Sequence, residues 1–97
     1  MQFEWDEPKN RANVRKHGLH FSDAMEMFEG PFLARPDTRG DYGEERWIGV
    51  GVTRGRVALV AFAVVSPETI RIISRRKATN EERKEYEAAI YDGLEAN

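Results

Sequence analysis

The feature that most constrains the fold is an apolar stretch at Val57–Val65, which reads VALVAFAVV. Its residues are apolar at successive positions, so a strand formed from it needs cover on both faces, which predicts a central strand. The preceding segment, Trp47–Thr53, also has strand character, and the Arg54-Gly55 pair between them predicts a tight hairpin turn. A further turn at 66–68 precedes a third strand that begins at Thr69. These three strands predict an antiparallel meander.

The third strand leads through a basic segment into a closing helix. Ile70 and Ile72 share one face of the strand by the two-residue period of a pleated backbone. Thr79 is followed three positions later by Glu82, a capping box that predicts a helix starting near Asn80. The residues expected on the buried side of this helix are Tyr86, Ala89, Ile90 and Leu94.

The N-terminal part predicts a short strand followed by a polar helix. Gln2–Trp5 is an aromatic segment that suits a first strand. Asp6 or Glu7 can cap a helix that ends near His17, with Gly18 placed to terminate it. Because this helix carries few apolar residues, it is either a solvated cover or part of a binding surface.

A second, amphipathic helix follows. Ser22 can cap it, and Gly30-Pro31 ends it. The apolar stripe that we expect to face the core is Phe21, Ala24, Met25 and Phe28. The segment Phe32–Asp37 then predicts a strand, and residues 38–45 predict a polar loop.

The predicted order of elements is β-α-α-β-β-β-β-α in one domain that covers residues 1–97. A chain of this length supports a single core of modest size. Strands joined by short turns pair antiparallel, and the helices must cover the apolar face of the sheet. The sequence therefore predicts an α+β fold in which an antiparallel sheet packs against two N-terminal helices and one C-terminal helix.

Composition excludes several kinds of site. The chain has no cysteine, which rules out disulfides, thiolate metal sites and a thiol nucleophile. Its two histidines lack a His-x-x-x-His spacing, and the acids at 37–45 match no calcium loop, so we expect no metal and no cofactor. The longest apolar run is too short to cross a bilayer, and no charged leader precedes an apolar stretch. We therefore expect a cytoplasmic protein without a membrane partner.

Charge is unevenly distributed along the chain. The formal net charge is −2, from 15 basic and 17 acidic residues, yet Lys9–Lys16 and Arg71–Lys77 contain no acid. This pattern predicts a local basic face that binds one run of phosphates. It does not predict binding along the length of a nucleic-acid duplex. Arg75, Arg76 and Lys77 lie where a strand ends, a place from which guanidinium groups can bind phosphate bidentately. The alternative is a solvated basic turn.

The remaining polar residues suit phosphoryl transfer on RNA without a metal. The candidates are a set of arginines, one histidine at a helix end, His17, and the glutamates beside Arg46. A carboxylate or an imidazole can take the proton from a ribose 2′-hydroxyl, arginines can stabilise charge on the phosphate, and a second acid can protonate the leaving 5′-oxygen. The same residues would also serve a protein that only binds acidic partners.

Several short motifs, in order, resemble the BrnT family of toxins. The match covers residues 3 to 90, nearly the whole chain. The motifs that carry it are Phe3-x-Trp5-Asp6, Lys9, Asn13, Lys16-His17-Gly18, Phe21-x-x-Ala24, Tyr42-Gly43-Glu44-x-Arg46, Gly49, Arg71-Ile72-Ile73-Ser74-x-Arg76-x-Ala78 and Glu82-Arg83-x-x-Tyr86.

The resemblance implies the toxin of a type II toxin–antitoxin system with a RelE-like fold, which cleaves RNA and inhibits translation. It implies a BrnA-like antitoxin whose ribbon-helix-helix domain binds operator DNA, so that DNA is contacted through the antitoxin. Glu44 or His17 is the expected base. The full catalytic set implied is His17, Glu44, Arg46, Arg71 and Arg76. The residues expected to bind RNA are Lys16, Ser74, Arg75, Lys77, Arg83 and Tyr86.

Each of these residues also has a structural interpretation. Arg71 can pair with an acid across the sheet, and Arg46 can form a surface ion pair with a neighbouring glutamate. Arg83 and Tyr86 can simply pack the last helix, and His17 can serve as a cation at a helix C-terminus. At the level of the whole protein, the alternative to a ribonuclease is a non-catalytic module that binds an antitoxin and acts as a co-repressor.

Overall fold

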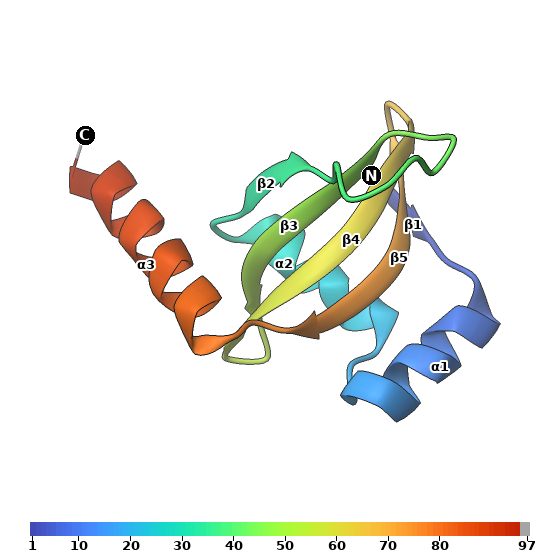
Figure 1. Ribbon diagram of the computed structural model, residues 1–97, viewed down its shortest axis with the longest axis horizontal. Coiled ribbons are helices and arrows are strands. Elements are labelled where there is room, and N and C mark those ends of the chain that lie inside the picture. Colours follow the sequence, from blue (N-terminus) through green and yellow to red (C-terminus); the bar gives the residue numbers. More distant parts are fainter. Residues whose placement is uncertain (96–97) are drawn as a thin grey trace.

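The computed structural model describes residues 1–95, and for Leu94 and Glu95 it describes the backbone alone (Figure 1). The predicted order of elements is confirmed, with a short 3-10 helix, η1, before the second α-helix. The elements are β1 (Gln2–Glu4), α1 (Glu7–His17), η1 (Phe21–Asp23), α2 (Ala24–Glu29), β2 (Leu33–Pro36), β3 (Arg46–Thr53), β4 (Arg56–Ser66), β5 (Thr69–Lys77) and α3 (Asn80–Glu95).

The five strands form one sheet in the order β1-β5-β4-β3-β2. Strands β2 to β5 pair antiparallel, and the expected meander of β3, β4 and β5 is present. Strand β1, however, pairs parallel with β5, where Phe3 lies opposite Ile70. The expectation of a purely antiparallel sheet was therefore wrong at this edge. No short turn ties β1 to its neighbour, and the intervening helices allow it to enter the sheet in either direction.

Helices η1 and α2 cover one face of the sheet, as Figure 1 shows with α2 behind β3 and β4. Phe62 and Phe28 meet edge to face at 5.1 Å in this core. Met27 is fully buried and Met25 is exposed, which reverses the expected assignment. The segment starts as a 3-10 turn, so its apolar side follows a three-residue period through Met27. Ser22 makes no capping hydrogen bond.

Helix α1 is attached to the fold by amides instead of apolar side chains. Its buried residues are Asn10 and Asn13. The Asn10 Oδ1 atom accepts a hydrogen bond from the Phe21 amide at 2.8 Å, and Asn13 Nδ2 donates to the Leu19 carbonyl at 2.9 Å. The helix ends at Gly18, whose φ of 72° is favoured by glycine, as expected. Asn13 Oδ1 also accepts from the Arg75 amide at 3.0 Å, which ties α1 to β5.

The other face of the sheet is largely uncovered. Its buried centre is Ile48, Leu59 and Ala61. Helix α3 stands beside this face and does not lie across it (Figure 1). It begins with the predicted capping box, and Tyr86 is buried, with its hydroxyl donating to the Pro31 carbonyl at 2.7 Å. Ala89, expected on the buried side, is exposed.

Two further points complete the fold. The side chain of Leu94, expected on the buried side of the last helix, lies outside the described residues. Among the described residues, no helix combines the length and the apolar character needed to cross a bilayer.

Candidate functional site

The uncovered face of the sheet carries a set of polar side chains from β5. In the β4–β5 register, Arg71 lies opposite Ala63, Ser74 opposite Ala61, and Arg76 opposite Leu59. Strict alternation along β5 would place Arg71 and Arg76 on opposite faces. The register shifts between Ala61 and Phe62, so that β5 has one extra residue there. This irregularity, with the character of a β-bulge, brings Arg71, Ser74 and Arg76 to one face.

A cavity of about 240 Å³ lies on this face, and we call it the His17 pocket. Its residues come from the end of α1, from β2 and the loop after it, and from the sheet. They are Lys16, His17, Arg35, Arg39, Ile48, Leu59, Ala61, Ser74, Arg75 and Arg76. None of them is acidic, and the carboxylates that pair with Arg39 and Arg76 lie outside the lining. Such a lining favours an anionic ligand.

Two carboxylates behind the lining orient two of its arginines. Arg76 donates from Nη1 and Nη2 to the carboxylate of Glu82 at 2.8 and 2.9 Å. Arg39 donates in the same bidentate way to Asp37 at 2.8 Å for each bond. The arginine partner lowers the pKa of Glu82 to about 2 and that of Asp37 to about 2. Both carboxylates are therefore ionised at neutral pH, and each holds its guanidinium group in a fixed orientation.

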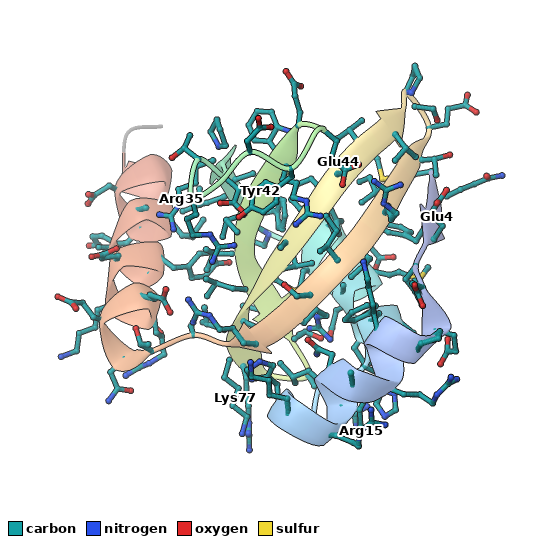
Figure 2. The ribbon with its side chains drawn as sticks, turned by 45° about the vertical axis from the view of Figure 1, so that its right-hand side comes forward. Glu4, Arg15, Arg35, Tyr42, Glu44 and Lys77 are labelled. Carbon is teal, nitrogen blue, oxygen red and sulfur yellow. The ribbon has the colours of Figure 1, made fainter. Side chains whose placement is uncertain are left out.

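Three of the predicted catalytic residues form a second cluster on the same face. The loop between β2 and β3 crosses the upper end of β4 and β5 (Figure 1). It carries Glu44 over the sheet, where Figure 2 shows its side chain. Glu44 accepts hydrogen bonds from Arg71 Nη2 and, at 3.3 Å, from Arg46 Nε. Arg46 also stacks on the Tyr42 ring, 4.0 Å from its centroid. The bond from Arg71, followed by that from Arg46, lowers the pKa of Glu44.

The structure thus divides the predicted catalytic set into two groups. His17 and Arg76 line the His17 pocket, whereas Glu44, Arg46 and Arg71 line a separate cavity of about 220 Å³. Arg71 and Arg76 lie opposite Ala63 and Leu59, which are four residues apart on β4, or about 13 Å at 3.3 Å per residue. Both groups face the same side of the sheet, so one extended ligand can reach both.

The predicted RNA-binding residues are also distributed. Lys16 and Ser74 line the His17 pocket. Arg75 is 1% exposed and projects to the opposite face, toward Met27, so it is not available for the direct RNA contact that we expected. Tyr86 is buried against the Pro31 carbonyl, which supports its structural interpretation. Arg83 pairs with Glu87 on the outer surface of α3 at 3.3 Å, and Lys77 lies on the face of Arg75.

Arg35 and Arg39 belong to the His17 pocket and were missed by sequence reasoning. Arg35 lies on the edge strand β2, and Figure 2 shows it on the same side of the sheet as Glu44. The only signal in the sequence was that both arginines lie close to Pro36-Asp37. That position does not indicate which face of the sheet the arginines occupy. Within the described residues, no group of three or more His, Asp or Glu side chains converges as a metal site would require.

Comparison with known proteins decides the family. A family model described as "Ribonuclease toxin, BrnT, of type II toxin-antitoxin system" matches residues 5–82. The chain belongs to the BrnT family. A crystal structure of the Brucella abortus ribonuclease toxin, BrnT, is 33% identical in sequence and superposes with a TM-score of 0.68. That match covers 82% of this chain and 99% of the Brucella chain. A search of curated proteins gives no significant match.

Membership of the BrnT family confirms the resemblance seen in the sequence. The chain is a ribonuclease toxin of a type II toxin–antitoxin system, with RNA as its target and an antitoxin as its partner. Its α+β architecture is that of the Brucella BrnT structure. The family match ends at Glu82, in the first turn of α3. Arg76 and the carboxylate that orients it are therefore both within the matched region.

Proposed function

We propose that the chain is a metal-independent endoribonuclease that cleaves RNA in the His17 pocket. The observation that carries this proposal is the lining of the pocket. It combines one imidazole with several cations and contains no acid. A carboxylate cluster would favour a divalent cation, whereas a cationic pocket favours the phosphodiester itself. His17 makes no hydrogen bond through its ring among the described residues, so both ring nitrogens are available to a substrate.

His17 is the better candidate for the general base. An imidazole both accepts and releases a proton near neutral pH, which suits removal of a proton from a ribose 2′-hydroxyl. Glu44 is less suitable because both of its oxygens accept hydrogen bonds from arginines, which lowers its pKa and weakens it as a base. We assign Glu44 the role of orienting Arg46 and Arg71, which bind a further phosphate of the strand.

The reaction follows from this assignment. His17 takes the 2′-proton, and the 2′-oxygen bonds to phosphorus while the bond from phosphorus to the 5′-oxygen breaks. Arg76 and Arg35 stabilise the charge that builds on the non-bridging oxygens. Lys16 lines the same pocket and can supply a proton to the leaving 5′-oxygen. The products are a 2′,3′-cyclic phosphate and a 5′-hydroxyl.

The test is to incubate the purified, antitoxin-free protein with RNA in EDTA and to analyse the new ends. Replacing His17 with Gln removes proton transfer and should slow cleavage by about 10²–10⁴-fold. Arg35→Gln should slow it by about 10²–10³-fold, the loss expected for one donor to the transition state. Arg35 is a cleaner target than Arg76, whose replacement also disrupts the pair with Glu82.

Arg15→Gln is the matched control. It removes the same charge from an exposed side chain of α1 (Figure 2) that does not line the pocket. RNA that stays intact in EDTA but is cut when magnesium is added would refute the metal-free mechanism. RNA that stays intact in both conditions, with an antitoxin still bound tightly, would favour the co-repressor alternative.

For the partner, the proposal is a BrnA-like antitoxin with a ribbon-helix-helix domain, through which the complex binds operator DNA in the cytoplasm. It is supported by membership of a type II toxin–antitoxin family. Co-expression with the protein encoded beside the toxin gene, followed by gel-shift on the operator fragment with and without the toxin, tests it. If the partner abolishes toxicity but the toxin–partner complex does not bind the operator fragment, the ribbon-helix-helix assignment is contradicted.

A further inference from the structure

A third and larger cavity, of about 510 Å³, lies at the end of the sheet that carries the β3–β4 hairpin. We call it the hairpin pocket, because the β3–β4 hairpin forms one wall and the turn between α1 and η1 forms another. Its lining residues are His17, Gly18, Leu19, His20, Asp23, Thr53, Arg54, Arg56, Ala58, Arg75 and Lys77. Of these residues, the catalytic proposal above uses His17 alone.

The rim of the hairpin pocket is strongly cationic. Arg54, Arg56 and Lys77 all line it, and Asp23 is its one acid. The Asp23 carboxylate lies 3.8 Å from Arg54, whereas Arg56 and Lys77 make no ion pair or side-chain hydrogen bond among the described residues. The rim therefore keeps an excess of positive charge, which is the condition for binding an anion.

The base of the pocket holds a buried cation without an acidic partner. Arg75 is 1% exposed, and its Nη1 and Nη2 atoms donate to the His20 carbonyl and to Met27 Sδ. Its Nε atom is buried and has no partner. No carboxylate forms an ion pair with this guanidinium group among the described residues, and the Asp23 and Glu26 carboxylates attract it only at longer range. An anion bound in the pocket would add to that attraction without direct contact with Arg75.

The hairpin turn supplies an independent observation. Arg54 has a φ of 51°, in the left-handed region, and is the one non-glycine residue with positive φ in the described chain. Asn-Gly is the favoured pair for such a two-residue turn, and Asn adopts this conformation at lower cost than Arg. A non-glycine residue held in a strained conformation points to a role for its side chain. At this position, the side chain adds a cation to the rim of the pocket.

The two pockets are neighbours near the end of β5, because they share two lining residues. His17 and Arg75 line both of them. We propose that the hairpin pocket binds a backbone phosphate of a nucleotide that flanks the cleaved bond, so that the RNA strand passes over His17 from one pocket into the other. This inference rests on the proposed function, since it takes the His17 pocket as the place of cleavage.

The test compares binding of a short and a long single strand of 2′-O-methyl RNA, which cannot be cleaved by 2′-hydroxyl attack, by fluorescence anisotropy. The variant is Arg54→Asn combined with Arg56→Gln. The control is Arg15→Gln combined with Lys84→Gln, which removes the same charge from exposed positions of α1 and α3. For the long strand, the plot of log affinity against log salt should become shallower by about 0.7, the change expected for one lost phosphate contact on a single strand. A dinucleotide, which fills the His17 pocket alone, should bind the variant and the wild type equally.

The single variant Arg54→Asn adds a check on folding. Its melting temperature should stay the same or rise, because Asn suits the turn, while its affinity for the long strand falls several-fold. Long-strand binding by the double variant that equals that of the control would overturn the inference and leave the proposed function intact. Equal affinity of the wild type for the dinucleotide and the long strand would overturn it as well. Absence of any RNA binding by the wild type would overturn both proposals.

Discussion

Replacing Glu82 with Gln should destabilise the fold in a pH-dependent way. Glu82 accepts two hydrogen bonds from Arg76 and one from the Thr79 amide at 2.8 Å, so it both holds the arginine and caps α3. Gln retains an oxygen for the Thr79 amide, since either residue serves in a capping box. It loses the charge that attracts Arg76. The substitution therefore isolates the ion pair from the helix cap.

The magnitude follows from the pKa. Arg76, followed by the Thr79 amide, lowers the pKa of Glu82 from 4.5 to about 2 in the folded protein. At about 1.4 kcal/mol per pKa unit, this corresponds to an upper limit of about 3 kcal/mol. The side chains of Arg76 and Glu82 are 41% and 27% exposed, so solvent screens the pair. Exposed pairs contribute about 0.2–1 kcal/mol, and we expect an intermediate loss of about 1.5 kcal/mol in the free energy of unfolding. The melting temperature should fall by roughly 6–12 °C at neutral pH.

The pH dependence gives the sharper result. Because the pKa of Glu82 is lower in the folded than in the unfolded state, its stabilisation is complete above pH 4.5 and is lost as the pH falls toward about 2. The melting curves of wild type and Glu82→Gln, followed by circular dichroism, should therefore converge over that range. Glu81→Gln, which removes a charge from the same turn of α3, is the control and should show little change. A difference between wild type and Glu82→Gln that persists down to pH 2 would refute the reasoning, as would equal stability at neutral pH.

Three further substitutions test the packing around the site by urea denaturation. Gly49→Ala should cost about 1–3 kcal/mol of unfolding free energy, because the new Cβ would lie 2.0 Å from the Phe32 ring. Gly51→Ala, where the nearest contact is 3.3 Å, should cost less, and an equal cost would contradict this account. Asn13→Ala should cost about 1–3 kcal/mol, because the buried amide of Arg75 loses its acceptor at 3.0 Å. A loss below about 1 kcal/mol would show that water replaces the Asn13 side chain.

The candidate site was predicted in part. Sequence motifs identified His17, Ser74 and Arg76, which the structure brings together. They did not separate these residues from Glu44, because a loop that crosses the sheet can carry a side chain to either end of a strand. They also missed Arg35, since nothing local indicates that an edge strand presents an arginine to a pocket formed by distant elements.

The sequence by itself determined the order of elements and most of their ends. The capping box at Thr79 and the glycine that ends α1 are local signals, because their hydrogen bonds join residues a few positions apart. Tertiary structure decided which face each residue of β5 occupies. One extra residue in that strand reverses the alternation, which buries Arg75 and turns Arg76 toward the His17 pocket. An irregularity of this kind is set by the fit of β5 against β4 and the helices, and that fit exists only in the folded chain.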